Sequence, residues 1–126
     1  MTKKAHSYRD LVAWKKAVEL VTEIYYLTKN FPKEEMFGLV SQIRRAAGSI
    51  PSNIAEGHAR ASRKEFQYFL SNSRGSVAEL ETHLIISHNL GFIIAPDLNR
   101  LLVQVAEVGR IINGLLTALK NKAAEP

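Results

Sequence analysis

The feature that most constrains the fold of this 126-residue chain is a 3–4 spacing of apolar residues that recurs in four long runs. This spacing places apolar side chains on one face of an α-helix, whereas a strand requires strict alternation, which the sequence lacks. The runs predict helices over about 8–29, 33–59, 63–90 and 96–121. Because the breaks are short, consecutive helices should be neighbours. We therefore predict one all-α domain spanning 1–126, an antiparallel up-and-down four-helix bundle.

The second run continues through a proline. Its apolar positions keep their phase on both sides of Pro51: Met36, Val40, Ile43, Ala47, Ile50 and Ile54. A loop has no reason to keep that phase, so we predict one helix kinked at Pro51, where proline removes a backbone hydrogen bond. Ser62 and Glu65 form a capping box that should start the third helix, and Gly91 should end it.

A polar stripe flanks the apolar face of the second helix. Its members are Arg45, Ser49, Asn53, Glu56 and Arg60, and Arg74 and Glu79 lie on the third helix. We interpret Ser49, Asn53, Glu56 and Glu79 as a structural network that fixes the register of the two helices. Asn53 and Glu56 should be buried and engaged by Arg45, Arg74 or backbone groups. The alternative is a pocket for a ligand or nucleic acid.

Several helices carry more apolar surface than one core face needs. The surplus residues are Leu84, Ile85 and Ile86, Val103 and Ile111, and Tyr25, Tyr26 and Leu27. This pattern favours self-association over a broad core face with scattered exposed residues. The mid-helix glycines Gly48, Gly75, Gly109 and Gly114 suggest close helix–helix approach.

Charge and composition narrow the partners and the location. The chain has no cysteine, which excludes disulfides and thiolate metal sites. It shows no signal core and no apolar run near the length of a membrane span, so we expect a cytoplasmic protein without a membrane. The net charge of +5 favours an anionic partner. Candidate nucleic-acid contacts are Arg44, Arg45, Arg60, Arg63, Lys64 and Arg74.

No catalytic pattern is evident. The di-iron sites of bundles require Glu-x-x-His on two helices, and the sequence has none. Glu79 and His83 are four residues apart, which is typical of a helix-surface pair. A phosphate loop, a nucleophile elbow and an HExxH motif are absent. We therefore expect no catalytic residues, no metal site and no cofactor, and a protein that is not an enzyme.

The stretch "QIRRAAGSIPSNIAEGHARASRKEFQYFLSNSRGSVAELETHL", together with "LVAWKKAVEL" and "FPKEEMFGL", resembles the bacterial proteins encoded in intervening sequences of 23S ribosomal RNA genes. The resemblance covers roughly residues 8–120 and implies an up-and-down bundle that assembles into a homopentamer. A more distant similarity, to which "AEVGRIINGLL" belongs, links the chain to the accessory proteins of diversity-generating retroelements. Those proteins bind nucleic acid and a reverse transcriptase.

Two functional hypotheses remain from the sequence. The first is a non-enzymatic homo-oligomer that binds RNA or DNA through backbone charge, with Lys15 and Lys16 as further contacts. The second is a structural or adaptor oligomer whose surplus apolar surface also holds a protein partner. One continuous basic face would favour the first hypothesis, and scattered charge would favour the second.

Overall fold

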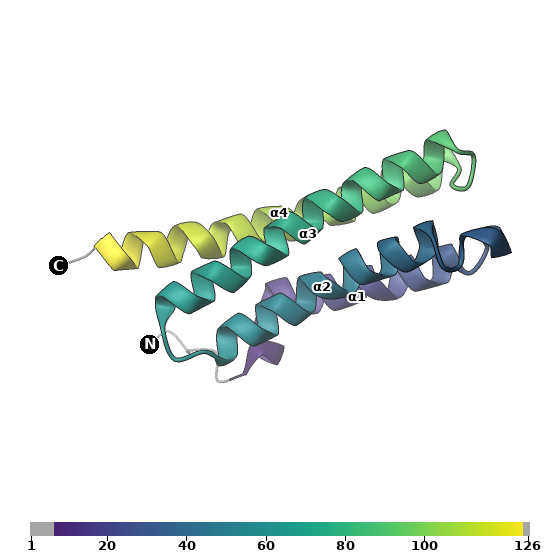
Figure 1. Ribbon diagram of the computed structural model, residues 1–126. Coiled ribbons are helices and arrows are strands. Elements are labelled where there is room, and N and C mark those ends of the chain that lie inside the picture. Colours follow the sequence, from purple (N-terminus) through teal and green to yellow (C-terminus); the bar gives the residue numbers. More distant parts are fainter. Residues whose placement is uncertain (1–6, 125–126) are drawn as a thin grey trace.

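A computed structural model describes the chain over residues 7–124, with side chains described for 7–121. Four helices make up the fold: α1 (Val12–Thr28), α2 (Leu39–Ala59), α3 (Arg63–Asn89) and α4 (Ala95–Ala124). In Figure 1 the α1–α2 and α3–α4 connections lie at one end of the bundle, and the α2–α3 connection lies at the other. Residues 7–124 contain no strand. The predicted all-α four-helix bundle is confirmed.

The core is formed by the predicted apolar stripes. α2 and α3 share the most extensive contact, and α1 also packs against α4, which closes the ring of four helices. The largest buried side chains come from all four helices: Leu20 and Ile24, Val40, Ile43, Ile50 and Ile54, Leu70, Leu80 and Leu84, and Leu101, Val105 and Ile112. The register of each helix therefore follows from its 3–4 apolar spacing.

Two predicted helix starts are displaced. α2 begins at Leu39 and not at 33, because Lys33–Glu35 forms a separate 3-10 helix, η2, and Gly38 leaves the helical region with φ −108° and ψ −107°. The first helix is likewise preceded by a 3-10 turn, η1 (Tyr8–Asp10), and by an extended Leu11. In both places the apolar spacing did not reveal where the α-helix begins. A 3-10 turn is so short that it leaves this spacing almost unchanged.

The predicted signals around α3 are confirmed. The Glu65 N–H donates to the Ser62 hydroxyl oxygen at 3.1 Å, and the Ser62 hydroxyl donates to the Glu65 carboxylate at 3.2 Å. After α3, Gly91 has a φ of +82°, which L side chains rarely adopt. Its N–H donates to the His88 carbonyl at 2.9 Å, so the last turn of the helix is closed.

α2 continues through Pro51 without interruption, and Pro51 itself is buried. The neighbouring Ile50 carbonyl accepts a hydrogen bond from the buried Ser73 hydroxyl at 2.8 Å. This bond ties the proline-containing turn of α2 directly to α3. The bend of the axis that we predicted at Pro51 stays a prediction.

The prediction of close helix–helix approach at the mid-helix glycines is wrong within one copy of the chain. An added Cβ would meet open space or an ordinary contact at Gly48, Gly75, Gly109 and Gly114. The close approach occurs instead at Gly57, where a Cβ would lie 2.7 Å from the Phe69 Cβ and 3.0 Å from the Phe66 Cδ1. The absence of a side chain at Gly57 therefore allows α2 and α3 to meet.

The fourth helix is more apolar than the sequence analysis allowed. Ala95–Asn121 is, by length and composition alone, long and apolar enough to cross a membrane, although only 22% of its most apolar window is buried in the bundle. Its apolar residues are spread around the helix and interrupted by Arg100, Glu107 and Arg110, so they do not form one run. Besides its buried stripe, α4 packs Leu98, Ile111, Leu115, Leu116 and Leu119 partly against the core, and Val103 is exposed.

Candidate nucleic-acid interface

Three of the six predicted basic residues come together at the α2–α3 connection. Arg60 is the C-cap of α2, and Arg63 and Lys64 occupy the first turn of α3. All three are exposed. The Ser62 cap fixes this corner, so the three cations are held at one end of the bundle.

The neighbours of these cations differ. Arg60 pairs with Glu56 at 3.6 Å and with Glu65 at 3.8 Å, and its guanidinium lies 5.1 Å from the centre of the Phe69 ring. Among residues 7–121, Arg63 and Lys64 form no ion pair. These exposed ion pairs contribute only about 0–1 kcal/mol to stability, but Glu56 and Glu65 offset part of the positive charge of the cluster, and Arg63 and Lys64 supply the remainder.

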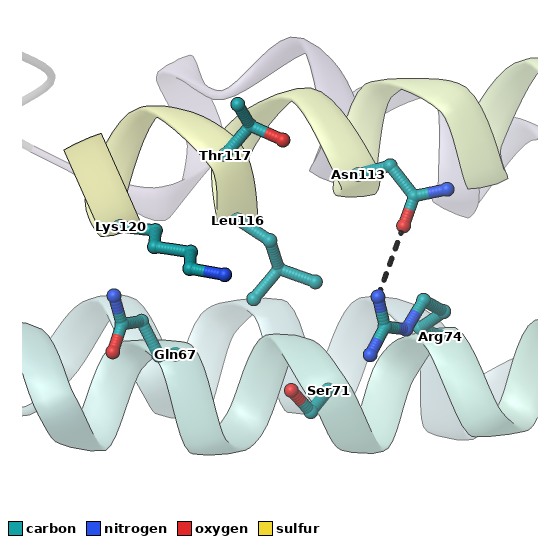
Figure 2. Close-up of a pocket in the computed structure, with 7 residues that line it drawn as sticks. All are labelled: Gln67, Ser71, Arg74, Asn113, Leu116, Thr117 and Lys120. Atoms are coloured by element: carbon teal, nitrogen blue, oxygen red, sulfur yellow. Dashed lines mark hydrogen bonds between the residues drawn. The ribbon is translucent and has the colours of Figure 1, made fainter.

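Arg74 lies farther along α3 and faces α4. Its Nη1 donates to the Asn113 Oδ1 at 3.4 Å, which is long for a hydrogen bond of this type. Both residues line a hollow of about 690 Å³ between the two helices (Figure 2). Lys120, which the sequence analysis did not select, lines the same hollow.

Arg44 and Arg45 do not join the other four. The Arg44 Nε donates to the Thr28 hydroxyl at 2.9 Å, and its guanidinium lies 4.4 Å from the centre of the Tyr25 ring. Arg45 pairs with Glu79 at 2.8 Å, between α2 and α3. The structure therefore places Arg44 and Arg45 in contacts that join neighbouring helices.

The predicted polar stripe is only partly assembled. Ser49 and Ser76 share a hydrogen bond of 2.8 Å across α2 and α3, and the Asn53 amide donates to the Ser49 carbonyl at 2.8 Å. Asn53 is half-buried and not fully buried as predicted, while its predicted contact with a backbone group is confirmed. Glu79 bridges Arg45 and His83, which lies 3.5 Å away.

The expectation that Glu56 is buried is wrong. Its side chain is 53% exposed and contacts Arg60, not Arg45 or Arg74. Glu56 lies in the last turn of α2, where the connection to α3 is open to water, so its carboxylate remains solvated. Arg74 turns instead toward Asn113 on α4.

Exposed large apolar residues gather mainly at one end of the bundle. This end, opposite the α2–α3 connection, also carries the exposed cations Lys29 and Lys33. There, exposed apolar side chains gather in the last turns of α1 and α3, in both connections and in the first third of α4: Tyr25, Tyr26, Met36, Phe37, Ile85, Ile86, Leu90, Ile94 and Val103. Phe37 is 96% exposed and Val103 is 67% exposed. We call this group the apolar end.

The surplus apolar residues predicted from the sequence divide between core and surface. Leu84 is buried in the core, and Leu27 and Ile111 pack against it. Ile85, Ile86 and Val103, with Tyr25 and Tyr26, remain exposed. Periodicity identified the surplus but could not separate these two groups, because neighbouring positions on a helix differ only by rotation about its axis.

The structure also reveals polar residues that the sequence analysis missed. Gln67 and Ser71 stand four residues apart on α3, and Ser71 stands three residues before Arg74. Asn113, Thr117 and Lys120 follow the same spacing on α4. Each set lies beside a core stripe, and that helical spacing was the available signal. Among the described residues, no group of three His, Asp or Glu could hold a metal ion.

The fold and these surfaces define a basic four-helix bundle with exposed cations at one end and exposed apolar residues at the other. The chain belongs to the 23S rRNA-intervening sequence protein family, whose family model matches residues 9–114. The resemblance found in the sequence is thereby confirmed.

A solved structure shares this fold. It is described as a protein of unknown function from the S23 ribosomal protein family of Bacteroides thetaiotaomicron. The two chains superpose with a TM-score of 0.75 and 22% sequence identity, over 83% of this chain and 98% of the other. At this identity the likeness shows the fold alone. A comparison with curated proteins finds no match.

Proposed function

We propose that this protein is a non-enzymatic homo-oligomer that binds RNA or DNA through the cations at its α2–α3 connection. The observation that carries the proposal is the exposed pair Arg63 and Lys64, which have no carboxylate partner among residues 7–121 and lie beside Arg60. The first turn of α3 adds the positive end of its helix dipole. An anion placed there meets Arg63, Lys64 and the positive helix end, with the Glu65 carboxylate of the same turn held by Ser62 and Arg60.

Phosphate is the anion that this arrangement suits. Arginine can hold a phosphate with two parallel N–H donors, and lysine adds a point charge. The cations lie on a corner and not in a deep pocket, so a long backbone can pass over them. Such contacts carry no base information, and we expect binding that depends on salt and not on sequence.

The apolar end supports self-association. Exposed apolar residues concentrated in one region mark interaction sites more often than scattered ones do. A ring of identical copies joined through this region would present the α2–α3 connection of every copy to the same nucleic acid. The family resemblance implies a pentamer.

A second candidate is an adaptor that holds a protein partner at the apolar end. The observation that favours it is Phe37, whose ring is almost fully exposed beside a hollow of about 360 Å³ lined by Tyr25, Met36 and Val40. Aromatic residues of this kind often anchor protein interfaces.

The test is a matched pair of double variants. Arg63→Ala/Lys64→Ala removes two exposed cations at the α2–α3 connection without touching the packing of Arg60 on Phe69. Lys29→Ala/Lys33→Ala removes the same charge from exposed positions at the other end. Affinity for fluorescein-labelled RNA and DNA oligonucleotides is measured by anisotropy over a range of salt concentrations.

The first variant should weaken binding to all sequences alike and should lower the slope of log affinity against log salt by about 2, one for each lost phosphate contact. The second variant should behave like the unmodified protein. Equal effects of both variants, or a loss confined to one sequence, would contradict the proposal. No binding by the unmodified protein would leave the adaptor as the better candidate.

A further inference from the structure

The hollow between α3 and α4 is built from two facing rows of side chains. Gln67, Ser71 and Arg74 lie at i, i+4 and i+7 on α3, and Asn113, Thr117 and Lys120 repeat the same spacing on α4. Figure 2 shows the Leu116 side chain between the two helices, with the Lys120 ammonium reaching toward it and the Gln67 amide rising from the opposite side.

The residues that line the hollow carry positive but no negative charge. The lining holds two cations, two amides, two hydroxyls and one leucine, and it contains no carboxylate. The nearest acidic side chains on these two helices are already engaged, since Glu65 pairs with Arg60 and Glu107 pairs with Lys16. The positive charge of Arg74 and Lys120 is therefore not neutralised within the hollow.

Arg74 is also loosely held. Its one hydrogen bond among the described residues, to Asn113, is 3.4 Å long, and its side chain is exposed. A guanidinium has five N–H donors, so most of them are available to a ligand. The amides of Gln67 and Asn113 can both donate and accept, as the edge of a nucleobase requires, and Leu116 offers an apolar surface to a base or a sugar.

We propose that the α3–α4 hollow binds a nucleotide, with its phosphate held by Arg74 at one end of the hollow or by Lys120 at the other (Figure 2). The hollow is open to solvent, since most of its lining residues are exposed, and its volume of about 690 Å³ is large enough to hold a nucleotide on its floor. The nucleotide is either free or part of the strand held at the α2–α3 connection. The second source rests on the proposed function and extends it from the corner of the bundle along α3.

The experiment compares Arg74→Gln/Lys120→Gln with Lys29→Gln/Lys33→Gln, a control that removes the same charge at the opposite end. Each protein is titrated with adenosine monophosphate by calorimetry and with a labelled oligonucleotide by anisotropy. Light scattering follows the assembly of each variant. Loss of the charge-assisted contact to the phosphate should lower affinity at least about tenfold in the hollow variant and leave the control unchanged.

Two results support the proposal and identify the source. Loss of adenosine monophosphate binding in the hollow variant alone indicates a free nucleotide, and it would stand even if oligonucleotides do not bind. Loss confined to oligonucleotide binding indicates a nucleotide of a bound strand.

Two results overturn the proposal. In the first, the hollow variant binds every probe as the unmodified protein does, including the case in which neither binds. If Arg63→Ala/Lys64→Ala still lost oligonucleotide affinity, the proposed function would survive without this site. In the second, the hollow variant changes the assembly, which would make the hollow a contact between copies and not a ligand site.

Discussion

Arg44 and Arg63 carry the same guanidinium group but have different surroundings. Arg44 is half-buried between α1 and α2, where it donates to Thr28 and lies over the Tyr25 ring. Arg63 is exposed in the first turn of α3 and forms no ion pair within residues 7–121. Composition counts both as positive charge, yet only Arg63 is free to meet a ligand. The role of a basic residue is therefore decided by its neighbours in the fold.

Gly57 shows how a single residue determines the contact between α2 and α3. Replacing Gly57 with alanine would place a Cβ 2.7 Å from the Phe69 Cβ, a distance that real Cβ atoms essentially never show. Because the Phe69 Cβ is attached directly to the backbone, one of the two helices must shift. We expect Gly57→Ala to lower the free energy of unfolding by about 1–3 kcal/mol, measured by urea denaturation at fixed protein concentration.

Gly75→Ala is the matched control for this change. Gly75 is exposed in α3, and an added Cβ there meets nothing within 4 Å. Alanine favours a helix over glycine, so this variant should gain up to about 1 kcal/mol. A stabilised Gly57→Ala protein would show that the two helices can separate there without cost.

At the scale of elements, the buried hydrogen bond from Ser73 on α3 to the Ile50 carbonyl on α2 should contribute more to stability than the exposed ion pair at the end of α2. Ser73→Ala removes the buried donor to the Ile50 carbonyl and should lower the free energy of unfolding by about 1 kcal/mol. Glu56→Ala removes only an exposed pair within α2 and should change it by less than about 0.5 kcal/mol. Urea denaturation of both variants checks the ranking, and a larger loss for Glu56→Ala would restore the buried network predicted from the sequence.

The elements themselves could be predicted well from the sequence. Apolar spacing identified all four helices because each must bury one face, and the Ser62 and Gly91 signals worked because they depend on local backbone bonding. The boundaries failed at Gly38 and Leu11, where 3-10 turns precede the helices. Those turns depend on how the chain enters the bundle, which apolar spacing does not encode.

The candidate site could be predicted only in part. Arg60, Arg63 and Lys64 are close in sequence, so their clustering follows from the turn that joins α2 and α3. Arg74 and Lys120 are far apart in sequence and line the same hollow only because α3 and α4 are neighbours. The burial of Glu56 was predicted wrongly because helical spacing gives only the face of α2 on which a residue lies. It does not show how far along α2 the partner helix covers that face.

At the scale of the whole molecule, the two ends differ in what they offer to a partner. The α2–α3 connection offers charge, and the apolar end offers side chains that water solvates poorly. Val103 is 67% exposed and lies on α4 away from its buried stripe of Leu101, Val105 and Val108. If the apolar end joins copies of the chain, a charge introduced there should separate them, because an unpaired buried charge is strongly unfavourable.

We therefore expect Val103→Glu to lower the molar mass measured by size-exclusion chromatography with light scattering. Val12→Glu is the control, since Val12 is also exposed, at 57%, but stands at the start of α1 near the α2–α3 end. Glutamate is a good helix former, and circular dichroism should show full helix content in both proteins. The control should keep the mass of the unmodified protein. A mass that falls in both variants, or in neither, would remove the apolar end as the place where copies meet.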